Sequence, residues 1–186
     1  MHRHPNGEDM TLELLRRASF LPGDRVLDLG AGDGDTLRLM ERLGLKTEGI
    51  DLKPGNGVAQ GDILNLPYAD GAFDGAIAEC VFSVCGDTAA AFREARRVLK
   101  PGGKLVLSDV YLPRGGCARM SLPRTADRTG WEAAGEGFSL VFFDDCTEVW
   151  TDYILDCVWH GIDIGDCGYF TRGVKFGYFK SIWIKT

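Results

Sequence analysis

Hydrophobic and polar residues alternate along this chain with two periods, one typical of helices and one typical of buried strands. Apolar residues recur every three or four positions in Glu8–Ala18, whereas Arg25–Leu29 and Lys104–Val110 are short and nearly continuous apolar runs. A continuous apolar run suits a strand that is covered on both faces. We therefore expect an α/β protein with a doubly wound, mainly parallel sheet.

Glycine, proline and capping residues divide the rest of the chain into further elements. Asp87 or Thr88 is expected to cap a helix that Pro101-Gly102-Gly103 ends. The predicted helices are Glu8–Ala18, Asp35–Leu43, a helix from Asp87 or Thr88 to Lys100, and Thr147–His160. The predicted strands are Arg25–Leu29, Thr47–Ile50, Gly57–Gln60, Gly75–Glu79, Lys104–Val110, Phe138–Phe143 and Tyr178–Ile184.

Two predictions concern the C-terminal half of the chain. The helix Thr147–His160 is expected to turn one apolar face inward, formed by Trp150, Ile154, Cys157 and Val158. The segment Leu112–Glu136 is expected to be irregular, and it holds Arg114, Arg119, Arg124 and Arg128. These arginines form either an ordinary solvated loop or an anion-binding lid.

Three glycines at alternate positions follow the first strand. They are Gly30, Gly32 and Gly34. In a dinucleotide-binding turn the third glycine stands one residue later, after two intervening residues. Asp33 and Asp35 surround the last glycine and would repel a phosphate. The turn therefore favours a ligand with positive charge, such as a sulfonium or an ammonium, and a nicotinamide oxidoreductase is the poorer interpretation.

Acidic residues also follow the next two predicted strands. Asp51 lies 19 residues after Gly32, near the spacing at which a carboxylate meets ribose hydroxyls. Its two oxygens can accept hydrogen bonds from both hydroxyls of a diol. Asp62 is placed to accept from an exocyclic adenine amine. The competing interpretations are that Asp28 only caps the turn, that Asp51 is an exposed strand end, and that Asp62 is a loop acid.

Taken in order, these motifs resemble the class I S-adenosylmethionine-dependent methyltransferases, in the small-molecule branch similar to the ubiquinone and arsenite enzymes. The motifs are Val26–Gly34, Gly49–Asp51, Gly61-Asp62-Ile63, Leu66-Pro67, Phe73-Asp74 and Arg93–Gly103 with Lys104-Leu105-Val106. The resemblance implies a Rossmann-like sheet of seven strands in the order 3-2-1-4-5-7-6, with the last strand antiparallel. It also implies in-line methyl transfer from S-adenosyl-L-methionine to a small-molecule acceptor, mainly through proximity and orientation.

The resemblance also implies which residues hold the cofactor. They are Asp28, Gly30, Ala31, Gly32, Asp51, Leu52, Asp62, Ile63, Glu79 and Cys80. In this assignment the glycine turn approaches the methionine part and ribose through its backbone, and Asp28 orients the turn. Asp51 takes the ribose hydroxyls, Asp62 and Ile63 hold the adenine, and Glu79 with Cys80 borders the methionine amine and the acceptor.

The candidate catalytic residues are Cys80 and Cys117. A thiolate is a soft ligand that suits trivalent arsenic, so an arsenical or thiol acceptor bound through these two residues is an alternative substrate. Against it, the arsenite enzymes have a cysteine upstream of the glycine turn, and none precedes Cys80 here. None of the six cysteines has C-x-x-C spacing, so no metal site is predicted, and Cys157 is expected to be a buried small residue.

Composition limits the remaining possibilities. The 186 residues, 45% hydrophobic, suit one domain over residues 1–186, with 112–136 as a lid or acceptor-side insertion. A net charge of −6 without a basic block disfavours nucleic acid, and the absence of a long apolar run or leader predicts a cytoplasmic protein away from membranes. The short region before the first strand leaves two alternatives open, a homodimer that covers the acceptor and a non-catalytic S-adenosylmethionine-binding sensor or partner subunit.

Overall fold

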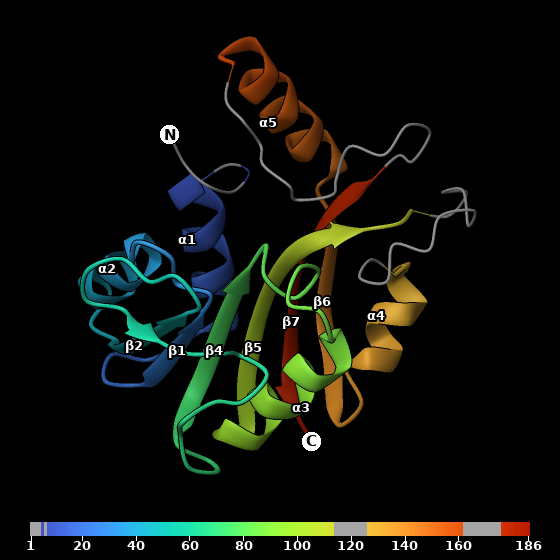
Figure 1. The fold of residues 1–186 in the computed structure, drawn as a ribbon. Coiled ribbons are helices and arrows are strands. Elements are labelled where there is room, and N and C mark those ends of the chain that lie inside the picture. The colour runs from blue at the N-terminus through green and yellow to red at the C-terminus, as the bar shows by residue number, and fades with distance from the viewer. Residues whose placement is uncertain (1–4, 6, 114–125, 162–175) are drawn as a thin grey trace.

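The computed structural model describes residues 5, 7–113, 126–161 and 176–186. Its centre is a seven-stranded sheet in the order β3-β2-β1-β4-β5-β7-β6 (Figure 1). β1, β2, β3, β4 and β5 pair in parallel, whereas β7 is antiparallel to both of its neighbours. The fold class, strand order and antiparallel last strand predicted from the sequence are therefore confirmed.

After an initial helix, strands and helices alternate along the chain, except that β2, β3 and β4 follow one another without a helix between them. The helices are α1 (Gly7–Ala18), α2 (Asp35–Arg42), α3 (Thr88–Val98), α4 (Arg128–Ala134) and α5 (Thr147–Trp159). The strands are β1 (Arg25–Leu29), β2 (Lys46–Asp51), β3 (Ala59–Gln60), β4 (Phe73–Glu79), β5 (Leu99–Tyr111), β6 (Phe138–Asp145) and β7 (Gly177–Lys185). All but one of these elements match the predicted ones to within a few residues; the exception, α4, was not predicted.

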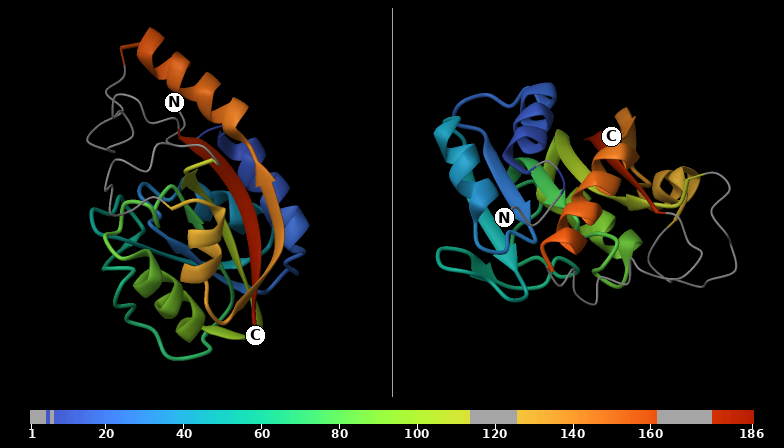
Figure 2. Two further views of the ribbon diagram at one scale, coloured as in Figure 1. Left: turned by 90° about the vertical axis from the view of Figure 1, so that its right-hand side faces the viewer. Right: turned by 90° about the horizontal axis from the view of Figure 1, so that it is seen from above.

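Each face of the sheet has its own hydrophobic core. Apolar residues of α1, α2 and α5 pack on one face, and those of α3 and α4 pack on the other (Figure 2). On the first face Trp150 of α5 stacks on Tyr178 of β7, with ring centroids 5.5 Å apart. On the second face Trp131 of α4 meets Phe179 of β7 edge-on at 5.0 Å. This double coverage explains why β5 is buried at every position from Leu105 to Tyr111.

Two predicted boundaries around α3 differ from the structure. α3 ends at Val98 and not at Lys100, because Leu99 has an extended backbone and pairs with Phe73 of β4. β5 consequently begins at Leu99 and includes the Pro101-Gly102-Gly103 segment that was expected to separate helix from strand. The predicted cap is confirmed, since the Asp87 side chain accepts from the backbone N–H of Ala90 at 2.9 Å.

Two further predictions for the C-terminal half were wrong. Arg128–Ala134 forms α4 inside the segment expected to be irregular, where Asp127 caps it by accepting from the Gly130 N–H at 2.9 Å. Val158, expected to face inward, is 62% exposed. The far end of α5 extends past the sheet in Figure 1, so its apolar face has no sheet beneath it there.

Several predicted features lie outside the described residues. These are Cys117 and the arginines at positions 114, 119 and 124. Among the residues that the structure does describe, no helix combines the length and hydrophobicity needed to cross a membrane.

Candidate functional site

The turn between β1 and α2 is built from backbone conformations that favour glycine. The φ angles of Gly30, Gly32 and Gly34 are +80°, +51° and +77°, which side chains on L-residues disfavour. The backbone N–H groups of Gly30 and Ala31 both donate to the carbonyl of Ile50, at 2.8 and 3.1 Å. The three glycines therefore bend the chain sharply at the carboxyl end of β1, against the end of β2.

Neighbouring segments approach this turn so closely that a side chain at Gly30 would clash with one of them. A Cβ built on Gly30 would lie 2.3 Å from a methyl group of Val81, which follows β4. The N–H of Gly55 donates to the carbonyl of Gly32 at 2.8 Å, and a Cβ on Gly55 would contact Asp33. The turn is thus fixed from both sides by segments that follow β2 and β4.

Asp51, at the end of β2, is hydrogen-bonded to the glycine turn. Its Oδ2 accepts from the Gly32 N–H at 3.0 Å, and its Oδ1 accepts from the Lys53 N–H at 2.7 Å. Each carboxylate oxygen has capacity for another donor, so these bonds leave room for ligand hydroxyls. Leu52, the next residue, is 63% exposed and presents an apolar surface beside the carboxylate.

Glu79, at the end of β4, is held by hydroxyl groups from two helices. Thr11 of α1 donates to its Oε1 at 2.9 Å, and Thr36 of α2 donates to its Oε2 at 3.1 Å. Sequence reasoning identified Glu79 but missed both threonines. The available signal was Thr11, a polar residue within the apolar face of α1, where it is only 1% exposed.

Asp28 is the most unusual group of the site. It is 4% exposed, and within residues 7–113, 126–161 and 176–186 its Oδ2 has no hydrogen-bond partner. Burial raises the pKa of Asp28 well above its ordinary value, and the negative charges of Glu79 and Asp51 raise it further. A buried acceptor beside two other carboxyl groups is costly unless a ligand supplies a donor or a positive charge.

Cys80 follows Glu79 and has a strained backbone with φ of +58°. Its Sγ lies 3.3 Å from the hydroxyl of Tyr178, which in turn donates to Oγ of Ser108 at 3.0 Å. Burial raises the pKa of Tyr178 well above its ordinary value, so the phenol stays neutral. No group of three metal-ligating side chains occurs in the described part of the chain.

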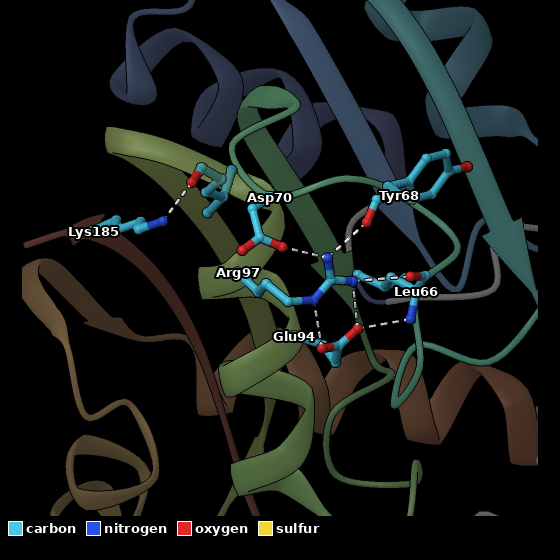
Figure 3. A network of polar contacts seen from close by, with 7 residues as sticks. Leu66, Tyr68, Asp70, Glu94, Arg97 and Lys185 are labelled. Atoms are coloured by element: carbon cyan, nitrogen blue, oxygen red, sulfur yellow. Dashed lines mark hydrogen bonds and ion pairs between the residues drawn. The ribbon is translucent and has the colours of Figure 1, made fainter.

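The segment after β3 carries the residues predicted to hold adenine. Oδ1 of Asp62 accepts from the Leu64 N–H at 2.9 Å in a tight local turn, and the Ile63 side chain is buried. Arg97 of α3 fixes the continuation of this segment by donating to the carbonyls of Leu66 and Tyr68. Figure 3 shows its guanidinium surrounded by these groups and by Glu94 and Asp70.

The parallel strands bring the predicted residues to one edge of the sheet. Asp51 and Glu79 are the last residues of β2 and β4, and Gly30 and Asp62 follow the carboxyl ends of β1 and β3. This is where ligands bind in doubly wound folds. The acidic groups, including the buried Asp28 oxygen that has no partner among the described residues, fit a ligand with positive charge and with hydroxyl groups.

Comparison with known proteins agrees with this geometry. Residues 27–107 match a family model described as "Methyltransferase domain". A demethylmenaquinone methyltransferase from Corynebacterium kroppenstedtii is 40% identical over 107 residues, which cover 53% of this chain and 47% of the relative. An arsenite methyltransferase from Aquipseudomonas alcaligenes is 34% identical over 122 residues, covering 52% of this chain and 35% of the relative.

A solved structure extends the likeness beyond the matched segment. The [4+2]-cyclase SpnF superposes with a TM-score of 0.76 and 23% identity, covering 95% of this chain and 80% of that chain. At this identity the likeness concerns the fold alone. The chain spans about half, or less, of the length of the curated relatives cited above.

Proposed function

We propose, from the match of residues 27–107 to a methyltransferase domain family, that this protein is a class I S-adenosylmethionine-dependent methyltransferase that transfers a methyl group from S-adenosyl-L-methionine to a small-molecule acceptor. The observation that carries the proposal is the buried Asp28 carboxyl, whose Oδ2 has no partner among the described residues. A positively charged ligand would relieve the cost of burying this group.

Each group at the strand ends has a distinct role in the proposed complex. The backbone of Gly30, Ala31 and Gly32 approaches the methionine part and the ribose, and Asp51 accepts from the ribose hydroxyls. Glu79, fixed by its two threonine contacts, lies beside the methionine amine.

The remaining cofactor contacts are apolar or lie at the rim of the site. Leu52 and Ile63 pack on the adenine, and Asp62 accepts from its amine. These contacts account for binding of a nucleoside whose other end carries positive charge.

Methyl transfer requires little of the protein beyond alignment of the methyl donor with the acceptor. Bound S-adenosyl-L-methionine supplies the electrophilic methyl group and its leaving group, and the site holds the acceptor in line with it. Cys80 lies on the acceptor side, next to Glu79. In this proposal the Cys80 thiol, which lies 3.3 Å from the neutral Tyr178 hydroxyl, borders the acceptor and helps to orient it.

We further propose a single cytoplasmic domain in which residues 112–136 help to cover the acceptor, alone or with a second subunit. Nucleic acid and membranes are not proposed as partners. A trivalent arsenical or thiol acceptor stays an alternative, motivated by Cys80, while Cys117 lies outside the described residues.

The test is calorimetric titration with S-adenosyl-L-methionine followed by transfer assays with labelled cofactor. The acceptors to assay are a reduced quinone precursor, a thiol and arsenite. Asp51→Ala is expected to lose most of the binding, whereas Glu41→Gln, which changes an exposed acid in the last turn of α2, is expected to retain it. Absence of binding by the wild-type protein would refute the proposal.

A non-catalytic binding module is the second candidate function. A protein named as a cyclase has a similar fold, so the fold is not restricted to methyl transfer, and binding of the cofactor has to be tested separately from transfer. Binding without labelled product from any extract or acceptor would favour the module, and a single labelled product would exclude it.

A further inference from the structure

We infer that Asp28 makes the site selective for the charge on the cofactor sulfur, so that the cationic substrate binds with release of a proton and the neutral product does not. This inference rests on the proposed function and adds to it a residue that discriminates S-adenosyl-L-methionine from S-adenosyl-L-homocysteine.

The position of Asp28 in the sheet supports this role. On β1 it is paired with Gly49 of β2 on one side and with Ile77 of β4 on the other. The strand ends that carry Asp51 and Glu79 therefore lie on either side of it. Its own carboxyl is almost fully buried, so solvent cannot screen it.

The charged groups that act on the Asp28 carboxyl are both acidic. They are Glu79 on β4 and Asp51 at the end of β2. The polar contacts that α1 and α2 make here, Thr11 and Thr36, are uncharged and donate to Glu79. On β7 the Tyr178 phenol is neutral. Among the described residues that shift the pKa of Asp28, none contributes a positive charge.

The free protein therefore holds a proton on Asp28 at a pH where an ordinary aspartate is ionised. A cation bound nearby favours the ionised carboxylate and drives this proton into solution. S-adenosyl-L-methionine carries a sulfonium and an ammonium, whereas S-adenosyl-L-homocysteine keeps the ammonium but has a neutral sulfur. The substrate should consequently gain more affinity than the product as the pH rises.

The experiment is calorimetric titration of the full chain with each of the two compounds, in two buffers of different ionisation enthalpy, between about pH 6.5 and about pH 8.5. We expect S-adenosyl-L-methionine to release close to one more proton than S-adenosyl-L-homocysteine wherever Asp28 is protonated. The ratio of the product's Kd to the substrate's Kd should rise with pH, by at most about tenfold per unit.

Two variants assign the effect to Asp28. Asp28→Asn should bind both compounds with a pH-independent ratio of Kd values, and Glu41→Gln, at an exposed position in the last turn of α2, should keep the wild-type dependence. If Asp28→Asn does not fold, the numbers of protons that the wild-type protein releases on binding each compound still test the inference. Equal proton release for both compounds, or a pH-independent ratio in the wild-type protein, would overturn the inference. Failure of both compounds to bind would instead overturn the proposed function.

Discussion

The backbone N–H of Gly32 donates to the carboxylate of Asp51 across 3.0 Å, so the residue proposed to hold the cofactor sugar also holds the turn that approaches it. The two residues belong to the ends of adjacent strands, β1 and β2. A ligand that meets the Asp51 carboxylate therefore meets the glycine turn as well, and the two contacts depend on each other.

Removal of the Asp51 carboxylate should affect both binding and stability. Asp51→Asn keeps the size of the side chain but can accept with only one of the two oxygens that bind the Gly32 and Lys53 amides. We expect a loss of about 1–2 kcal/mol in the free energy of unfolding. The Kd for S-adenosyl-L-methionine should rise at least about tenfold. Urea titration and calorimetry measure the two effects, and unchanged values of both would contradict the assigned contacts.

The glycine turn offers a comparison between two positions with similar backbone angles. Gly34→Ala should cost about 1–2 kcal/mol, because its φ of +77° disfavours a side chain while the nearest atom is 3.4 Å away. Gly30→Ala should cost about 1–3 kcal/mol more, since its Cβ would overlap Val81. In the double variant Gly30→Ala/Val81→Ala the additional cost should largely disappear. Equal losses for the two single variants would show that Val81 does not restrict the turn.

The strand ends were the predictable part of the site. Gly30, Asp51 and Glu79 each stand at or just after the end of a predicted strand, and parallel strands bring such ends to one edge of the sheet. The order of the strands came from the family resemblance, because apolar runs do not specify which strands are neighbours. The orphaned oxygen of Asp28 was not predictable, since it depends on what surrounds the carboxyl in three dimensions.

Contacts between distant residues account for most of what was missed. Thr11 and Glu79 are separated by 68 positions, and no periodicity links a hydroxyl on one helix to a carboxylate on a later strand. α4 has only seven residues, too few to establish a helical period in a segment rich in glycine and arginine. Val158 lies on the apolar face of α5, but the pattern does not tell how far the sheet extends beneath it.

The two threonines that hold Glu79 should contribute separately to cofactor binding. Thr11→Val and Thr36→Val each remove one donor to a carboxylate, which should destabilise the protein by about 1 kcal/mol and raise the Kd for S-adenosyl-L-methionine about 3- to 10-fold. Thr→Ser at either position should restore binding. Thr151→Val, at an exposed site on α5, serves as the control. An unchanged Kd in both valine variants would show that Glu79 needs no such support.

Arg97 should be more important to stability than its neighbour Arg93 on the same helix. The Arg97 guanidinium donates to two carbonyls and two carboxylates that belong to α3 and to the segment before β4 (Figure 3). Lysine cannot reproduce this planar set of donors, so Arg97→Lys should lower the free energy of unfolding by about 2–3 kcal/mol. Arg93→Lys affects only an exposed ion pair at 4.0 Å and should cost less than about 0.5 kcal/mol. Similar losses in urea unfolding would argue against the network.

Asp109 should make stability depend on pH in the opposite sense to an ion-paired carboxylate. Burial raises the pKa of Asp109 to about 6, although hydrogen bonds from Ser83 and Val110 favour the charged form. Its stabilising contribution is therefore complete below the unfolded pKa of about 4 and is lost as the pH rises through about 6. The unfolding free energy of the wild-type protein minus that of Asp109→Asn should fall by about 2 kcal/mol between about pH 4.5 and about pH 7.5. A difference in unfolding free energy that does not change over this pH range would contradict a raised pKa at Asp109.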